Sequence, residues 1–130
     1  YELVPSVIYT HPEIAWVGMS EDDLKKSEIS YKTGSFPFAA NGRALTSGET
    51  SGIVQIYADD STDEILGVQV FGPSASELVQ QALIAMDNGV TSKKLGETVF
   101  SHPTVSEALH EANLAINGRA IHIQNTIKEV

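Results

Sequence analysis

Residues 54–70 read Val-Gln-Ile-Tyr-Ala-Asp-Asp-Ser-Thr-Asp-Glu-Ile-Leu-Gly-Val-Gln-Val, and their pattern indicates the type of fold. Apolar residues occupy alternate positions on both sides of its centre: Val54, Ile56, Ala58, Leu66, Val68 and Val70. Between the two halves lies the polar segment 59–64, which is typical of a turn. Alternation with a period of two places one set of side chains in a core and the other, which includes Gln55, Tyr57 and Gln69, on a wetter face. The sequence therefore predicts an antiparallel hairpin.

Shorter elements are expected upstream of this hairpin. The predicted strands span residues 4–9, 14–17 and 31–38, and a turn is predicted at Asn41-Gly42. The third strand is expected at the edge of the sheet, because Gly34 and Pro37 would weaken a central strand. Ser20 followed by Asp23 has the residue types of a helix N-terminus, which predicts a short charged helix through about residue 27.

Helices are expected downstream of the hairpin. Ser74 with Glu77, and Thr104 with Glu107, have the spacing of a capping box ahead of apolar residues with helical periodicity. The glycines expected to end these two helices are Gly89 and Gly118, and a shorter helix is predicted at residues 92–97. Strands early and helices late predict an α+β fold, an antiparallel sheet with helices packed on one face, over a single domain of residues 1–130.

The first long helix has one irregular feature. Its apolar surface continues around the cylinder at Ile84 and Ala85, so little polar surface remains in the second half. Two interpretations stay open: a well-buried helix, or a second apolar contact with another domain or subunit.

The composition is that of an ordinary globular chain, with 42% hydrophobic and 19% charged residues among 130. Eight basic and seventeen acidic residues give a net charge of -9, which repels nucleic-acid phosphates and anionic lipid. We therefore expect neither nucleic acid nor a membrane among the partners. The absence of cysteine removes disulfides, thiolate metal sites and cysteine nucleophiles from this chain. The chain begins at Tyr1 without a basic-then-apolar start, so we expect a piece of a longer protein and no signal peptide.

The segment 100–107, Phe-Ser-His-Pro-Thr-Val-Ser-Glu, contains the candidate catalytic residues. Pro103 disfavours a helical backbone at His102 and so holds the imidazole in an extended stub just before a helix. Glu107 lies in the first helical turn, on the side from which its carboxylate can reach back to the ring. A carboxylate bonded to one ring nitrogen fixes the tautomer and leaves the other nitrogen as acid or base. From the residues alone, a helix-cap role for Glu107 and a turn role for His102 stay open.

Three segments of the chain, in the right order and at suitable distances, carry a resemblance to a known family. These segments are Tyr-Thr-His-Pro-Glu-Ile-Ala-Trp-Val-Gly at 9–18, Phe-Pro-Phe-Ala-Ala-Asn-Gly-Arg-Ala at 36–44, and His-Pro-Thr-Val-Ser-Glu at 102–107. The chain resembles, over nearly its whole length, the C-terminal interface domain of the flavin-dependent pyridine nucleotide–disulfide oxidoreductases. Residues 36–44 look like the lipoamide branch, the dihydrolipoamide dehydrogenases, in particular. One departure is Phe100, where that branch often carries a second histidine.

The resemblance implies an active site divided between the two subunits of a homodimer. His102 matches the family's acid/base for dithiol–disulfide exchange, Glu107 matches the glutamate that orients it, and Pro103 matches a residue near the partner's flavin. A base is needed because a thiolate, rather than a thiol, attacks disulfides. FAD, NAD and the redox disulfide are implied to lie in domains absent from this chain, so the fragment alone is expected to bind no cofactor and to be inactive.

The resemblance also implies partners and a location. The partners are the lipoyl domains of 2-oxo acid dehydrogenase complexes or of the glycine cleavage system. The location is a bacterial cytoplasm or a mitochondrial matrix.

Three alternatives remain. The glutathione reductase branch shares the His-Pro-Thr element, and a non-catalytic oligomerisation module would also fit the isolated chain. A metal site is the third, since Glu107 and His110 have Glu-x-x-His spacing, but di-iron sites need two such motifs and two further glutamates, so we expect no metal. His11 and His122 fall in a predicted turn and tail, and surface roles are expected for both.

Overall fold

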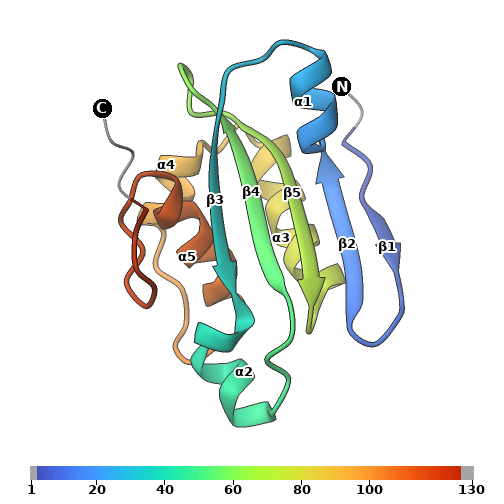
Figure 1. The fold of residues 1–130 in the computed structure, drawn as a ribbon, viewed down its shortest axis with the longest axis vertical. Helices are drawn as coiled ribbons and strands as arrows, with labels where there is room; N and C mark the ends of the chain where they lie inside the picture. Colours follow the sequence, from blue (N-terminus) through green and yellow to red (C-terminus); the bar gives the residue numbers. More distant parts are fainter. Residues whose placement is uncertain (1–2, 127–130) are drawn as a thin grey trace.

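The structure, a computed structural model that describes residues 3–126, contains a five-stranded antiparallel sheet (Figure 1). The strands are β1 (Ser6–Ile8), β2 (Glu13–Gly18), β3 (Tyr31–Pro37), β4 (Ile53–Asp59) and β5 (Ile65–Gly72). Their order across the sheet is β1-β2-β5-β4-β3, so β2 pairs with β5 rather than with β3. The three predicted upstream strands are confirmed, and β3 is an edge strand as expected.

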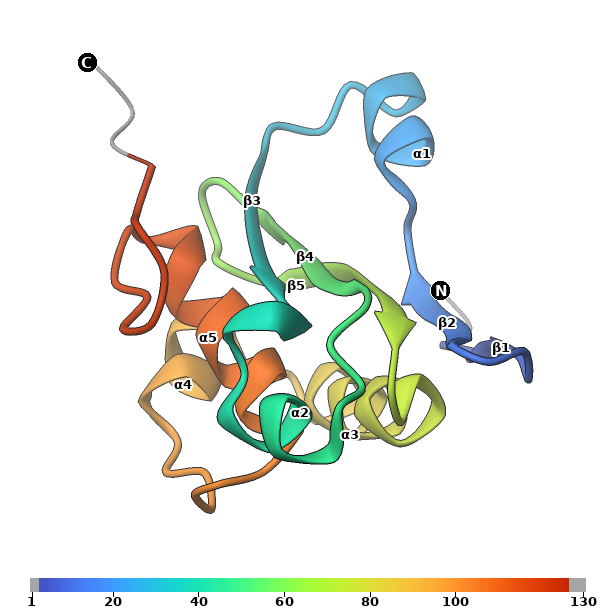
Figure 2. The ribbon, with the colours of Figure 1, turned by 60° about the horizontal axis from the view of Figure 1, so that its bottom comes forward.

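A layer of helices covers one face of the sheet. α3 (Ala75–Asp87) packs on β2 and β5, and α5 (Glu107–Ile116) packs on β3 and β4. The shorter elements are α4 (Ser92–Glu97), which packs on α5, and the 3-10 helix η1 (Phe38–Ala40) and α2 (Gly42–Ser47), which follow β3. Figure 2 shows this layer beneath the sheet and α1 (Glu21–Lys26) above it. The predicted α+β class is confirmed. No helix within residues 3–126 is both long and apolar enough to cross a membrane.

The predicted hairpin forms β4 and β5 and supplies the centre of the core. Its almost wholly buried members that pack with the helices are Val54, Ile56, Val68 and Val70. One detail of the prediction is wrong, because the register shifts next to Tyr57 and Ala58 pairs with Ile65. An extra residue in one strand reverses the faces beyond it. Ile65 therefore takes the core position, whereas Leu66 packs with a smaller cluster on the other side of the sheet.

The opposite face of the sheet is covered at one end by α1. Ser20 and Asp23 form the predicted capping box: the Asp23 N–H donates to Ser20 Oγ at 3.2 Å, and the Ser20 N–H donates to Asp23 Oδ2 at 3.0 Å. Leu24 of this helix packs with Met19 and Tyr57. Tyr57, expected on the wetter face, is therefore only 2% exposed.

Beyond α1, the same face carries several large apolar residues that are partly exposed. Ile14, Trp16, Ile53 and Phe71 are 37–42% exposed. Together with Gln55 and Gln69 they line a shallow hollow of about 310 Å³. A contiguous apolar patch of this kind is typical of a surface that another polypeptide covers.

α3 begins in a different way from the prediction. Ser74 has a left-handed backbone conformation with φ 56° and makes no capping hydrogen bond. The carboxylate of Glu13, at the start of β2, accepts instead from the backbone N–H and the hydroxyl of Ser76, at 3.0 and 2.9 Å. This bond satisfies an N-terminal N–H and places a negative charge at the positive end of the helix dipole. The predicted C-terminal glycine is confirmed, since Gly89 follows the helix with φ 66°.

The apolar surface of α3 divides between its two candidate residues. Ala85 is 7% exposed and belongs to the core side of the helix, whereas Ile84 is 55% exposed. Only Ile84 therefore presents apolar surface for a second contact.

α5 crosses β3 directly over Gly34. A Cβ atom at that position would lie 2.1 Å from the carbonyl oxygen of Ala112 and 2.7 Å from the backbone nitrogen of Ile116. Only glycine permits so close an approach of two backbones. α5, which begins at Glu107, therefore packs directly against the backbone of the edge strand β3.

Candidate functional site

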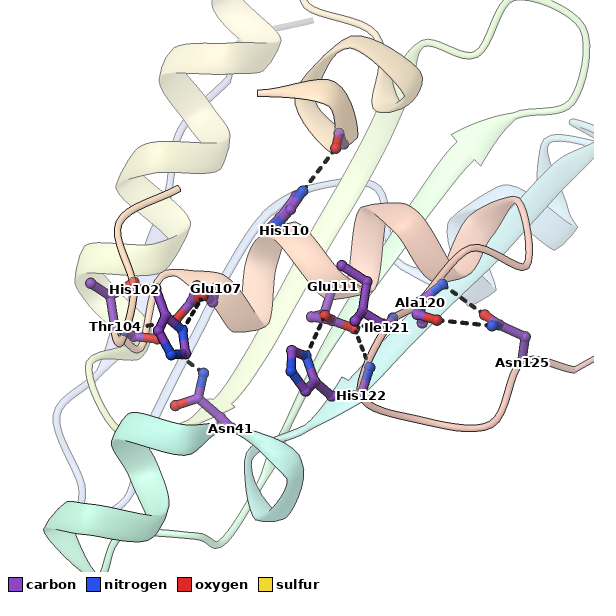
Figure 3. Close-up of polar contacts among 11 residues, drawn as sticks. Asn41, His102, Thr104, Glu107, His110, Glu111, Ala120, Ile121, His122 and Asn125 are labelled. Atoms are coloured by element: carbon purple, nitrogen blue, oxygen red, sulfur yellow. Dashed lines mark hydrogen bonds and ion pairs between the residues drawn. The ribbon is translucent and has the colours of Figure 1, made fainter. Parts of the chain in front are cut away.

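The segment between α4 and α5 presents His102 at the surface (Figure 3). The His102 side chain is 70% exposed, and its Nδ1 lies 2.8 Å from Oε1 of Glu107, whose side chain is 19% exposed. An ionised carboxylate can only accept, so Nδ1 carries the hydrogen and Nε2 is left to take up or release a proton. The structure thus brings the two predicted residues together. Pro103 lies beside them and is exposed.

Glu107 also serves as a helix cap, with its second oxygen. Oε2 accepts from the backbone N–H of Thr104 at 2.8 Å, which is half of the predicted capping box. The other half is absent, because the Thr104 hydroxyl donates to the carbonyl of Ser101 at 2.7 Å and α5 begins only at Glu107. The two interpretations of Glu107 are therefore not exclusive: one oxygen caps and the other holds the imidazole.

The environment of Glu107 favours its ionised form. Burial alone would raise the pKa of this carboxyl, but the hydrogen bonds from the Thr104 N–H and from His102 outweigh it. The charges of His102 and His122 act in the same direction, so the pKa of Glu107 lies below its ordinary value. A carboxylate that is ionised at neutral pH can stabilise an imidazolium beside it.

Two residues from other parts of the chain hold the His102 segment in place. Asn41 is 2% exposed; its Oδ1 accepts from the Ala44 N–H, and its Nδ2 donates to the carbonyl of Thr104 at 3.0 Å. The predicted turn at Asn41-Gly42 is therefore the capped start of α2. Gln81 of α3 donates to the hydroxyl of Ser106 at 3.0 Å. The second bond of Asn41 spans 63 positions, so no local pattern could have assigned it to the site.

Phe100 and His110 anchor the start of the same segment. Their rings stack with centroids 4.9 Å apart and planes 8° from parallel, and His110 Nε2 lies 2.8 Å from the carbonyl oxygen of Gly96. Glu107 and His110 are thus engaged with different partners. Within residues 3–126 no cluster of three or more candidate metal-binding side chains occurs.

A second imidazole–carboxylate pair lies near the first. Nδ1 of His122 is 2.8 Å from Oε1 of Glu111, a residue of α5 whose side chain is 4% exposed. The surface position expected for His122 is confirmed, since its side chain is 56% exposed, but the contact of its ring with a buried carboxylate was not predicted from the sequence. The side chain of His11 is 87% exposed, and its Nε2 lies 3.9 Å from Oε1 of Glu49.

The family of the chain follows from comparison with known proteins. The family model described as the pyridine nucleotide-disulphide oxidoreductase dimerisation domain matches residues 4–113. This chain belongs to that family.

Within the family, the chain is similar to dihydrolipoyl dehydrogenases. It is 50% identical over 123 residues to the mitochondrial dihydrolipoyl dehydrogenases of Sus scrofa and Homo sapiens, a match that covers 94% of this chain and 24% of each relative. Among solved structures, LpdA from Mycobacterium tuberculosis superposes with a TM-score of 0.79 at 32% identity, over 85% of this chain and 24% of that one. The HOCl-induced flavoprotein disulfide reductase RclA from Escherichia coli gives a TM-score of 0.82 at 26% identity, over 87% of this chain and 26% of that one. The chain thus spans about a quarter of the length of these relatives.

Proposed function

We propose that this chain is the dimerisation domain of a dihydrolipoamide dehydrogenase and that it supplies His102 and Glu107 as an acid/base pair for dihydrolipoamide oxidation. The observation that carries the proposal is the 2.8 Å contact between His102 Nδ1 and Glu107 Oε1 on an exposed segment. The 50% identity to dihydrolipoyl dehydrogenases supports the lipoamide branch over the glutathione reductase branch.

In this proposal the pair moves a proton. Nε2 of His102 accepts the proton of a substrate thiol, which leaves the thiolate that attacks a disulfide. Glu107 stabilises the imidazolium so formed and keeps the ring in the tautomer that presents Nε2. Release of the same proton later returns the pair to its starting state.

Electron transfer belongs to parts of the protein outside this chain. FAD and NAD, bound by those parts, would carry the electrons taken from the dithiol. The sequence has no cysteine, so the redox disulfide is also assigned to another segment, in a partner subunit. Pro103, exposed beside His102, is proposed to approach the partner's flavin. By itself the 130-residue chain is expected to bind no flavin and to reduce no lipoamide.

The proposed assembly is a homodimer that acts on lipoyl domains of a 2-oxo acid dehydrogenase complex or the glycine cleavage system. A bacterial cytoplasm or a mitochondrial matrix is the proposed location. The alternative of a non-catalytic oligomerisation module predicts that neither His102 nor Glu107 affects turnover.

The test uses the full-length protein and stopped-flow measurement of the two half-reactions. His102→Gln is expected to slow dithiol oxidation by roughly 10²–10⁴-fold, the usual scale for general acid–base catalysis. Flavin reduction by NADH should change little, because hydride transfer does not pass through the imidazole. Glu107→Gln can keep the cap to Thr104, but it should slow dithiol oxidation and move the pH–rate profile to lower pH, since the imidazolium loses its counter-charge. Wild-type dithiol kinetics in His102→Gln would overturn the proposal.

A further inference from the structure

The second imidazole–carboxylate pair, His122 and Glu111, is held in place by several hydrogen bonds, as the first pair is. Glu111 lies one helical turn after Glu107 on α5, so the two carboxylates project from the same side of the helix. Its Oε1 contacts His122 Nδ1 at 2.8 Å, and its Oε2 accepts from the backbone N–H groups of Ile121 and His122 at 2.9 and 3.3 Å. A buried carboxylate with three donors is satisfied, as buried charges have to be.

The segment that carries His122 is a closed loop. The side chain of Asn125 bonds both the N–H and the carbonyl of Ala120, at 2.8 and 2.9 Å (Figure 3). Ala120 is 8% exposed, and Ile123 packs against the main core. The position of His122 is therefore determined by contacts on both sides of it in the sequence.

Both pairs line one hollow of about 200 Å³, here called the shared hollow. The titratable groups in its lining are His102, Glu107, Glu111 and His122. β3, η1, α2 and the turn that joins them contribute only uncharged residues, among them Phe36, Asn41 and Leu45. The two imidazoles therefore share this lining with no charged group other than their own two carboxylates. The charge of His122 already contributes to the lowered pKa of Glu107, after burial and the closer hydrogen bonds.

We propose that His122, held by Glu111, is a positioning residue of the candidate site whose charge sets the protonation of the His102–Glu107 pair across the shared hollow. The proposal rests on the proposed function, because it assigns His122 an effect on the proton that His102 moves. Like charges that face the same small hollow disfavour one another. His122 does not touch the substrate in this scheme.

The experiment measures the pH dependence of dithiol oxidation by stopped flow in the full-length protein. The variant is His122→Gln, and the matched control is His11→Gln, which removes a histidine that does not line the shared hollow. In His122→Gln the acid limb of the profile is expected to move to higher pH by about half a unit or more, below the 1–3 units produced by a charge within about 4–6 Å. The limb is expected to move to higher pH because the variant removes a cation and leaves the negative charge of Glu111 without its partner. Both changes favour the protonated form of His102. The control should leave the limb in place.

A second variant separates electrostatics from loss of structure. Glu111→Gln keeps an oxygen for the backbone N–H groups but removes a negative charge, so it should move the same limb to lower pH. A role limited to holding the 120–125 loop predicts the same effect for both variants, and that result overturns the proposal. If Glu111→Gln does not fold, as judged by far-UV circular dichroism, His122→Gln decides alone, since its ring is already 56% exposed.

Failure of this inference is distinguishable from failure of the proposed function. If His102→Gln keeps wild-type dithiol kinetics, the proposed function is wrong. If His102→Gln is slow but the His122→Gln profile superimposes on that of the wild type, only the role of His122 is wrong.

Discussion

The close approach of α5 to β3 predicts that Gly34→Ala is strongly destabilising. The added Cβ would lie 2.1 Å from the carbonyl oxygen of Ala112 and 2.6 Å from Cγ1 of Ile116. Carbon–oxygen contacts normally lie near 3.3–3.6 Å, so α5 would have to retreat by roughly 1.2 Å. The nearest atom is backbone and cannot rotate away. Over-packing of this kind costs about 1–3 kcal/mol, and we expect the upper end of that range.

Urea unfolding of the 130-residue chain, followed by circular dichroism, measures this cost. A loss of about 3 kcal/mol in a domain of this size corresponds to a Tm lowered by on the order of 10 °C. The matched control is Gly42→Ala, because a Cβ at Gly42 meets nothing within 4 Å. At the start of α2 this change should leave stability unaltered or raise it by about 0.5 kcal/mol. A Gly34→Ala chain as stable as the control would show that α5 does not rest on the β3 backbone, and the geometry of both glutamates on α5 would then be in doubt.

Two further predictions concern assembly and acid stability. Ile84→Glu should shift the full-length protein from dimer toward monomer in sedimentation equilibrium, while the far-UV spectrum stays native, because Ile84 is exposed. Ala85→Glu should instead unfold the chain, because Ala85 is buried. An unchanged dimer in Ile84→Glu would show that α3 is not part of the interface. Because the pKa of Glu107 is lower in the folded chain than its ordinary value of 4.5, its contribution to stability is present above about pH 4.5 and disappears as the pH falls through the lowered pKa. Chemical unfolding between about pH 6 and about pH 3 should therefore show a smaller acid-induced loss in Glu107→Gln than in the wild type, and equal losses would contradict the lowered pKa.

A local pattern predicted the structure best where two neighbouring residues complete the interaction by themselves. Ser20 and Asp23 satisfy each other within one turn, so their spacing was sufficient to predict the capping box. Ser74 and Glu77 have the same spacing, yet the helix is capped by Glu13, which is 63 positions from Ser76. Sequence spacing carries no information about a partner that only the sheet brings into reach.

The same limit applies to the candidate site. His102 and Glu107 are five positions apart, and their contact was predicted from the proline and the helix start between them. Glu111 and His122 are separated by a helix end and a closed loop, so their contact was not predicted from the sequence. The register shift beside Tyr57 was also invisible, because Ile65 and Leu66 are equally apolar and either could have faced the core.

The order of the strands has a consequence for how the chain assembles. β4 and β5 are joined by a short turn and β3 directly precedes β4 in the sheet, so these three strands can pair with little loss of loop entropy. β2 pairs with β5 over a much larger sequence separation, which is 55 positions for Ala15 and Val70. We therefore expect the β1–β2 hairpin to dock late, onto a nucleus that already holds both long helices. Only with that docking does Glu13 reach Ser76, so the first turn of α3 is completed at the end of folding rather than at its start.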